Sequence, residues 1–308
     1  MFETTALKSD GDFLENNNFS EKSIGKIINR ASNMLRDAGI INHQAEARHL
    51  MMEFLNEDLA SIYSRLADEL DDVTAMRYMK AVKKRTTHYP FQYIIGYTYF
   101  MEYKFNCKEK VLIPRYDTEN LVMHSLDLSK NRDMKVMDLC CGTGCIGISY
   151  YLWRKRDGYK DDVTLVDISD DAIALSKENA EKLDADVRVV QSDLFSAFRD
   201  EDGNPNCKFD MILSNPPYIK TGDINFLMKD VREFEPRLAL DGSRDGLNFY
   251  RRIISELRDF LVEDGKIVFE IGDEQYMDVS ELLRDEGFKD IVKLRDMSGY
   301  DRVVSAGL

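Results

Sequence analysis

The sequence predicts an α/β fold class, with a doubly wound sheet that follows a small N-terminal helical domain. Between residues 135 and 305, short apolar runs alternate with helical patterns, which is typical of a parallel sheet covered by helices. Residues 20–88 show helical periodicity without such runs. The 308 residues are enough for two domains.

The first 19 residues have neither a cationic start nor an apolar stretch, so they do not form a signal peptide. We predict that residues 1–19 form a disordered tail. Ser20 is expected to cap the first helix of the helical domain, and Gly39 to end it. The apolar residues at helical spacing in this domain include Ile24, Ile27, Ile28, Ala31, Leu35, Met51, Met52, Phe54, Leu55, Met76, Met79 and Val82.

Residues 89–115 are predicted to form a β-hairpin linker between the two domains. The stretch from Phe91 to Phe105 is dense in aromatic and β-branched residues, and Gly96 supplies a turn. Asp117 or Thr118 then caps a helix that opens the second domain, residues 116–308. The expected strands of that domain are 135–139, 163–167, 187–190, 209–214, 266–271, 291–294 and 302–305.

Composition excludes several classes of function. The net charge of −14 argues against broad electrostatic binding to a phosphate backbone. The cysteine count of 5 is odd, which argues against a disulfide scaffold and favours a reducing, cytoplasmic compartment. Cys140, Cys141 and Cys145 lack the spacing and the nearby histidine of a zinc site, so we expect no metal. No apolar run is long enough to cross a membrane.

A glycine-rich segment follows the first expected strand and opens a helix, with the sequence Asp138-Leu139-Cys140-Cys141-Gly142-Thr143-Gly144-Cys145-Ile146-Gly147. Its glycines let the backbone turn tightly and approach a ligand. Asp167, at the end of the second strand, is placed to accept hydrogen bonds from ribose hydroxyls. This spacing fits NAD and S-adenosylmethionine (AdoMet) about equally. Asp138 favours AdoMet, because its carboxylate can face a cationic amino-acid group that NAD lacks.

The end of the third strand carries Asp193 and Leu194. In an adenosyl site, Asp193 can accept the adenine amino group and Leu194 can pack on the ring. The alternative is a capped helix start with no ligand.

The end of the fourth strand carries Asn215-Pro216-Pro217-Tyr218. Adjacent prolines stiffen this loop and leave carbonyls that helix or sheet does not use. The Asn215 side chain adds another carbonyl, and a planar NH2 group needs two acceptors. With Tyr218 as an aromatic wall, the loop indicates an enzyme that acts on an amino or amide nitrogen. The alternative is a proline-rich turn in which the asparagine caps its own loop.

Together these motifs resemble the peptide release factor glutamine methyltransferases, the PrmC or HemK family. The resemblance spans residues 20–308 and departs at Cys140, where the family usually has glycine, and at Tyr116-Asp117, where it often has Pro-Glu. Besides the glycine-rich segment and Asn215–Ile219, the matching blocks are Pro90–Gly96, Leu112–Glu119, Glu235–Leu240, Asp245–Leu247, Glu270–Gly272 and Asp301–Val304.

The resemblance implies a seven-stranded Rossmann-like methyltransferase sheet. It implies methyl transfer from AdoMet to the side-chain amide nitrogen of a glutamine in the Gly-Gly-Gln motif of a peptide chain release factor, with the helical domain holding that protein. We expect a monomer with no nucleic-acid or membrane partner. The implied catalytic residues are Asn215, Pro216 and Tyr218, which also bind substrate together with Pro217 and Arg115. The implied AdoMet-binding residues are Asp138, Cys140, Cys141, Gly142, Thr143, Gly144, Asp167, Asp193, Leu194 and Asn215.

Other functions remain open at this point. A nucleic-acid amino methyltransferase uses the same kind of loop to bind an amino nitrogen, but it needs base flipping and a surface that recognises nucleic acid. The excess of acidic residues in this chain disfavours such a surface. A branch of the resembled family that acts on a large-subunit ribosomal protein shares the four-residue loop. A dinucleotide oxidoreductase explains the glycines but not Asn215–Tyr218, and a non-catalytic binding module has no need of Asn215.

Overall fold

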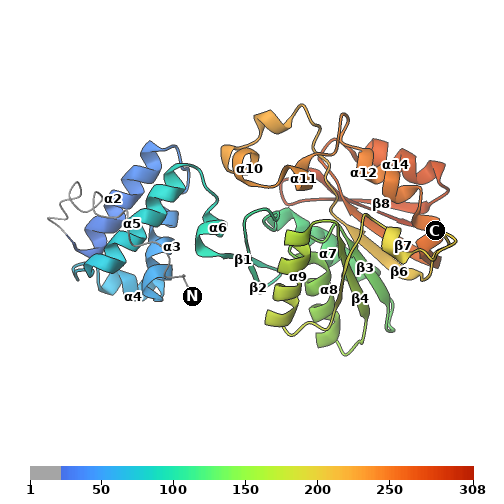
Figure 1. Cartoon of the computed structure of the whole chain (residues 1–308), viewed down its shortest axis with the longest axis horizontal. Helices are drawn as coiled ribbons and strands as arrows, with labels where there is room; N and C mark the ends of the chain where they lie inside the picture. The colour runs from blue at the N-terminus through green and yellow to red at the C-terminus, as the bar shows by residue number, and fades with distance from the viewer. Residues whose placement is uncertain (1–21) are drawn as a thin grey trace. The chain divides into compact units, whose positions relative to one another are not determined.

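The computed structural model describes residues 22–308, so the predicted tail and Ser20 lie outside the described residues. The chain divides into two compact units between Ile95 and Gly96. Figure 1 shows the helices of the first unit and the sheet of the second. The predicted domain boundaries, after residues 88 and 115, lie on either side of this division.

The first unit is built from short helices that pack their apolar faces together. Asp71 accepts a hydrogen bond from the Thr74 N–H at 2.9 Å and so caps α5. The buried Arg85 side chain binds Glu46 of α3, with 2.6 Å between Nε and Oε2. The elements of this unit are α2 (Ile24–Asp37), α3 (His43–Leu55), α4 (Leu59–Ser64), α5 (Asp72–Thr86) and α6 (Phe91–Ile95).

Helix α6 corrects the prediction of a hairpin from Phe91 to Phe105. The Pro90 carbonyl accepts hydrogen bonds from the N–H groups of Tyr93 and Ile94, which forms a helical turn. The apolar side chains of Phe91 and Ile94 pack against the core of the helical unit, and this packing overrides their β propensity. The hairpin is therefore confined to β1 (Tyr97–Phe100) and β2 (Tyr103–Asn106).

The second unit contains, within residues 22–308, a seven-stranded sheet with the order β5-β4-β3-β6-β7-β9-β8. Strands β3 to β7 pair in parallel with one another, whereas β9 is antiparallel to both β7 and β8. The sheet is therefore mixed rather than wholly parallel. The strands are β3 (Lys135–Leu139), β4 (Asp162–Asp167), β5 (Arg188–Gln191), β6 (Phe209–Ser214), β7 (Leu261–Glu270), β8 (Lys289–Arg295) and β9 (Asp301–Gly307).

The antiparallel pairing of β8 with β9 follows from the short connection between them. A tight turn can join antiparallel neighbours, whereas a parallel pair needs a long crossover. Asp296 holds this turn, because its Oδ1 accepts from the N–H groups of Ser298 and Tyr300 at 2.9 and 3.0 Å.

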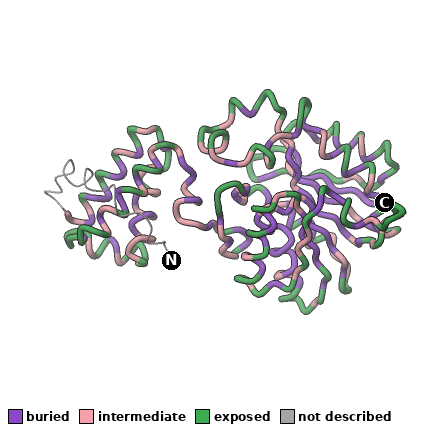
Figure 2. The backbone as a smooth tube through the Cα atoms, viewed as in Figure 1, coloured by how far each residue is buried: buried purple, intermediate pink, exposed green. Residues whose placement is uncertain are grey.

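The sheet is covered on both faces, as Figure 2 shows by the buried path of its strands. Alternate residues of β3 point into different cores: Met137 and Leu139 belong to one apolar cluster and Val136 to the other. This double burial explains why the central strands β3, β4 and β6 are near-continuous apolar runs in the sequence, unlike the more exposed edge strands β5 and β8. The longer covering helices are α7 (Glu119–Leu128), α8 (Cys145–Arg156), α9 (Asp170–Lys182) and α14 (Tyr276–Asp285), and the shorter ones are α10 (Lys229–Phe234), α11 (Arg237–Leu240), α12 (Asn248–Ile254) and α13 (Leu257–Phe260).

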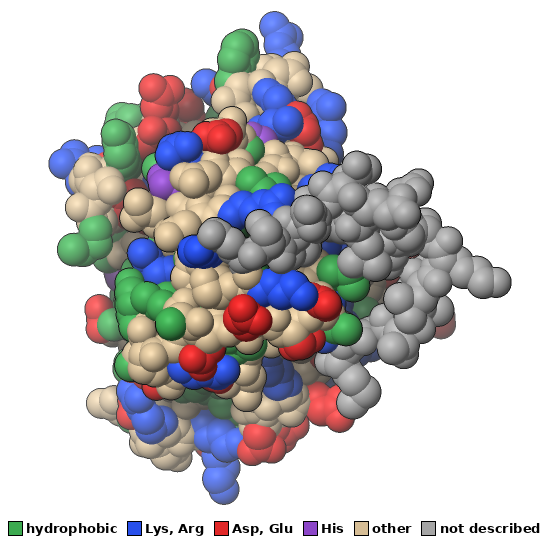
Figure 3. Space-filling view, turned by 90° about the vertical axis from the view of Figure 1, so that its left-hand side faces the viewer, with side chains coloured by type: hydrophobic (Ala, Val, Ile, Leu, Met, Phe, Trp, Pro, Cys, Tyr) green, Lys and Arg blue, Asp and Glu red, His purple; other side chains and the backbone are tan. Residues whose placement is uncertain are grey.

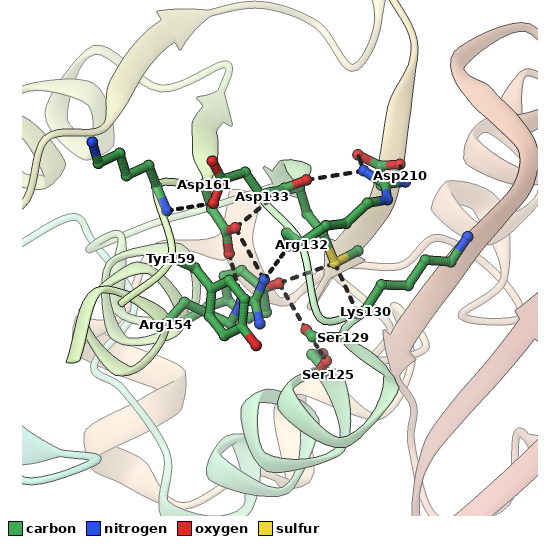
Figure 4. A network of polar contacts seen from close by, with 12 residues as sticks. Ser125, Ser129, Lys130, Arg132, Asp133, Arg154, Tyr159, Asp161 and Asp210 are labelled. Carbon is green, nitrogen blue, oxygen red and sulfur yellow. Dashed lines mark hydrogen bonds and ion pairs between the residues drawn. The ribbon is translucent and has the colours of Figure 1, made fainter. Parts of the chain in front are cut away.

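A polar network ties together the amino ends of β3, β4 and β6 (Figure 4). The buried Arg154 guanidinium binds the Asp161 carboxylate, with 2.7 Å between Nε and Oδ2. Asp161 also accepts from the Met134 N–H at 2.9 Å. At the start of β6, Asp210 pairs with Arg132 and accepts from the Lys135 N–H. The parallel strands are thus held in register at the edge opposite to their carboxyl ends.

The surface carries charges of both signs. Basic and acidic side chains are interspersed on the face that Figure 3 presents. None of the helices among residues 22–308 combines the length and the apolar character that a membrane crossing requires.

Candidate active site

A pocket opens at the carboxyl ends of β3, β4, β5 and β6. In the sheet, β4 lies on one side of β3 and β6 lies on the other, so the strand order reverses at β3. Doubly wound sheets bind ligands at such a switch point. Of the predicted site residues, those that line the pocket are Arg115, Cys140, Cys141, Gly142, Thr143, Asp167, Asp193, Leu194, Asn215 and Pro217.

The glycine-rich loop between β3 and α8 is held in one conformation. Gly144 has φ of +79°, and a Cβ there would lie 2.9 Å from Ile148 Cδ1 and 3.0 Å from Leu165 Cδ1. Glycine at this position is therefore needed for both backbone conformation and packing. Cys140 also has a positive φ, of 64°, where a non-glycine residue is strained. Gly144 supports the loop without lining the pocket, whereas Cys140 lines it.

Asp138 is fully buried beneath this loop and does not itself line the pocket. Its Oδ2 accepts a hydrogen bond from the Gly147 N–H at 2.9 Å, and its Oδ1 has no donor among the described residues. Burial raises the pKa of this carboxyl to about 7, although the Gly147 N–H opposes the shift. The unpartnered oxygen is a buried acceptor, which suits a cationic group bound next to the loop.

Asp167 ends β4 and lines the pocket, as predicted from its spacing. Its two oxygens accept from the N–H groups of Ser169 and Gly142, each at 2.9 Å. Burial raises the pKa of Asp167, and these backbone N–H groups oppose the rise. Each carboxylate oxygen can accept a second hydrogen bond, so Asp167 can still receive a ligand hydroxyl.

Asp193 lines the pocket, but its carboxylate is already paired. Arg252 Nη2 of α12 lies 2.8 Å from Oδ1 and 2.9 Å from Oδ2. The pairing fixes the carboxylate and leaves its remaining lone pairs for an amino group. Leu194, the other predicted adenine contact, lies beside it in the pocket with φ of 50°.

Asn215 also lines the pocket, and a hydrogen bond to Thr118 orients its side-chain amide. Its Nδ2 donates to Thr118 Oγ1 at 3.4 Å, which leaves the side-chain oxygen as an available acceptor. The loop is clamped in place, since Gln275 Nε2 donates to the Tyr218 carbonyl at 3.0 Å. A Cβ at Gly242 would lie only 2.7 Å from Tyr218 Cα, so the chain packs closely against the loop there.

The structure differs from the prediction that Tyr218 forms an aromatic wall of the pocket. Tyr218 packs against an apolar core, and its O–H donates to Glu270 Oε1 at 3.1 Å. Burial raises its pKa well above the usual value of a tyrosine. Pro216 is likewise buried without lining the pocket, whereas Pro217 does line it.

Arg115 lines the pocket and also forms an ion pair with the buried Glu235, with 2.5 Å between Nη2 and Oε1. Burial raises the pKa of Glu235, and Arg115 opposes the rise. Other residues that line the pocket and were not predicted as site residues include Thr118, Pro236, Leu238, Ala239, Phe249 and Arg252. Thr118, Pro236, Leu238 and Ala239 fall within sequence blocks that carry the family resemblance, which is the signal that could have found them.

The chain matches two protein-family models. The methyltransferase small domain matches residues 117–243, and the PrmC N-terminal domain matches residues 26–96. A release factor glutamine methyltransferase of Clostridium botulinum is 38% identical over 279 residues, which cover 89% of this chain and 95% of the relative. The chain belongs to the release factor glutamine methyltransferase family. Another family member, from Clostridium acetobutylicum, is 35% identical over 90% of this chain and 95% of the relative.

Among solved structures, the chain is similar to a release-factor-specific protein-(glutamine-N5) methyltransferase from Alicyclobacillus acidocaldarius. That protein is 27% identical, with 66% of this chain and 98% of that chain covered and a TM-score of 0.38. The methyltransferases of the family use AdoMet. The residues present fit this methyl donor. Asp167 lines the pocket and suits the ribose, and Asp138, which is buried beneath the loop without lining the pocket, has an unpartnered carboxylate oxygen that suits a cationic group.

Proposed function

We propose that this protein transfers a methyl group from AdoMet to the side-chain amide nitrogen of the glutamine in the Gly-Gly-Gln motif of a peptide chain release factor. Family membership supports the reaction, since the relatives carry that activity in their names. The observation that carries the proposal is the orientation of Asn215, whose amide N–H is used by Thr118 and whose oxygen is left for a substrate N–H.

The task of the site is to align an unreactive nitrogen. An amide nitrogen is a poor nucleophile because its lone pair is delocalised into the carbonyl. AdoMet supplies a methyl group on a sulfonium, which is a strong electrophile. The protein therefore has to hold nitrogen, methyl carbon and sulfur in line at close approach, and such positioning lowers the barrier substantially.

Asn215 and Pro216 do this work. The Asn215 side-chain oxygen accepts one N–H of the glutamine amide, and we assign the other to the backbone carbonyl of Pro216, which follows Asn215 directly although it does not itself line the pocket. Both acceptors favour the positive charge that develops on nitrogen as the N–C bond forms and the bond from methyl to sulfur breaks. The demethylated donor leaves as a neutral thioether, and one N–H proton passes to solvent. No strong base is needed before transfer. None of the histidines in the described chain lines the pocket, and His124 is held by Ser305 at 2.8 Å.

Arg115 completes the substrate side of the pocket in this proposal. Its ion pair with Glu235 ties the segment before α7 to the segment before α11. Both segments line the pocket, so the pair shapes the opening through which a glutamine side chain enters. The monomeric state, the absence of a nucleic-acid partner and the cytoplasmic location stay predictions from the sequence.

The test is incubation of the purified protein and AdoMet with a release factor, followed by mass spectrometry of the Gly-Gly-Gln peptide. One methyl group on the glutamine is the expected product. A release factor with asparagine in place of that glutamine is the control and should stay unmodified. Large-subunit ribosomal proteins and single-stranded DNA are tested in parallel. Methylation of either, with the release factor untouched, would replace the proposed substrate.

A further inference from the structure

Gln275 is a buried side chain that contacts the Asn215–Tyr218 loop without lining the pocket. It comes directly before α14, and only 7% of its surface is exposed. Its Nε2 donates to the Tyr218 carbonyl at 3.0 Å and to the Gly246 carbonyl at 3.2 Å. Its Oε1 accepts from the Gly272 N–H at 2.9 Å. Both hydrogens of the amide and its oxygen are therefore in use.

These partners allow only one orientation of the amide. The Gly272 N–H can only donate, so it pairs with the oxygen of Gln275 and turns the NH2 group toward the two carbonyls. Two carbonyl oxygens that converge on one point repel each other unless a donor lies between them. Gln275 supplies the donor that lets the Tyr218 and Gly246 carbonyls approach each other. Without it, the loop loses the hydrogen bond at its last residue.

The surrounding backbone is shaped to fit the Gln275 amide. Gly246 has φ of +77°, and a Cβ there would overlap the Tyr218 carbonyl oxygen and lie 2.6 Å from Gln275 Nε2. A Cβ at Gly272 would lie 3.0 Å from Gln275 Oε1. Glycine at both positions therefore lets the backbone come close enough for all three hydrogen bonds. An amide, with two hydrogens to donate and an acceptor oxygen, matches the two carbonyls and the N–H group that meet there.

Gln275 holds one end of a stiff loop. At its other end, the loop continues directly from β6 of the sheet. Pro216 and Pro217 lock φ at both positions and restrict the residue before each of them. Few backbone dihedrals between β6 and Tyr218 can thus absorb a movement. A displacement of the Tyr218 carbonyl is therefore passed on to Pro216 and Asn215.

We propose that Gln275 is a positioning residue for methyl transfer, which holds the loop so that Asn215 and Pro216 present their oxygens to the acceptor nitrogen. The inference rests on the proposed function for its effect on rate. Gln275 does not line the pocket, so it acts on the reaction through the loop. A misplacement of reacting groups by about 1 Å costs about 100-fold in rate, so a small movement of the loop is enough.

Gln275→Met removes the hydrogen bonds of this amide. Methionine has a similar length but offers no N–H group for the two carbonyls. We expect kcat for release-factor methylation to fall about 100-fold, with KM for the release factor and the AdoMet dissociation constant near their wild-type values. Glu274→Gln, which changes the exposed neighbour of Gln275, is the control and should keep the wild-type rate. A wild-type kcat in Gln275→Met, or a parallel loss of AdoMet binding, would overturn the proposal.

Gln275→Glu tests the donor itself. The carboxyl group keeps the shape and the acceptor for Gly272, but it has a hydrogen for the Tyr218 carbonyl only when protonated. Burial favours the neutral form of such a group, so the ratio of its kcat to that of wild type should fall as pH rises from 6 to 8. The ratio for Gln275→Met should stay constant, since that variant keeps the charged groups that influence Tyr218, which are Glu270, Arg302 and Arg115. A constant ratio in Gln275→Glu, or the same fall in both variants, would contradict the role of the donor.

A measurement without substrate separates this inference from the proposed function. The backbone N–H signal of Ile219 and the side-chain NH2 signals of Asn215 report the position of the loop in the free protein by NMR. Both should shift in Gln275→Met and stay in place in Glu274→Gln. Unchanged signals in Gln275→Met would refute the link between Gln275 and the loop, whatever the substrate is. If the signals shift as expected while the wild-type protein leaves the release factor unmodified, only the proposed substrate fails.

Discussion

Asp138→Asn is expected to change how the stability of the protein depends on pH. The pKa of Asp138 is raised from 3.8 to about 7, chiefly because the carboxyl is fully buried. Asparagine keeps an acceptor for the Gly147 N–H but cannot ionise. The comparison between wild type and variant therefore isolates the cost of holding a buried carboxylate in the ionised form.

The sign follows from the direction of the shift. Because the folded pKa lies above that of the unfolded chain, the folded state binds the proton more tightly between these two values. The contribution of Asp138 to the free energy of unfolding therefore falls as pH rises from about 4 to about 7, and it is constant above that. A shift of about three units corresponds to about 4 kcal/mol at 1.4 kcal/mol per unit.

Urea denaturation of both proteins between pH 4 and pH 8 measures this difference. The variant should gain stability relative to wild type across that range, by up to about 4 kcal/mol, with the gain complete near pH 8. Asp171→Asn, which changes a half-exposed acid of the same unit, is the control and should show no such trend. Parallel curves for wild type and Asp138→Asn would refute the reasoning.

The same variant tests the predicted role of Asp138 toward AdoMet. A cationic group bound near its unpartnered Oδ1 stabilises the ionised form, so AdoMet affinity should increase as pH rises through about 7 in the wild type. Asp138→Asn should lose this dependence. Calorimetric titrations at pH 6 and pH 8 decide it, and an unchanged pH dependence in the variant would limit Asp138 to supporting the loop.

Three further outcomes are expected. Asn215→Ala should lower glutamine methylation roughly 100- to 1,000-fold in a single-turnover assay while AdoMet affinity is kept, and a wild-type rate would end its assigned role. Cys140→Gly should be more stable to urea than Cys140→Ala by about 1 kcal/mol, because both variants lose the thiol but only glycine is unstrained at φ of 64°. The reverse order of stability would contradict the backbone strain inferred at this position. Asp161→Ala should cost about 3–5 kcal/mol in thermal or urea unfolding, since Arg154 is left buried and unpaired, whereas the exposed Asp162→Ala should cost little.

The positions of the strand-end motifs were accessible from the sequence. The central strands β3, β4 and β6 are buried on both faces, so they stand out as apolar runs, and β3 and β6 have the predicted bounds. Parallel strands bring their carboxyl ends to one edge, so Asp167 and Asn215 had to come near each other whatever the details of packing.

What the tertiary structure alone decided is the direction in which side chains point and what they pair with. Tyr218 turns to Glu270, 52 positions later in the chain, and Asp193 pairs with Arg252, 59 positions later. The partner of Asn215 lies 97 positions earlier. Likewise, the β-branched segment before Gly96 is helical because a core of distant residues covers it. Local patterns report periodicity and backbone preference, whereas the pairing of polar groups depends on which distant residues the fold brings within hydrogen-bonding distance.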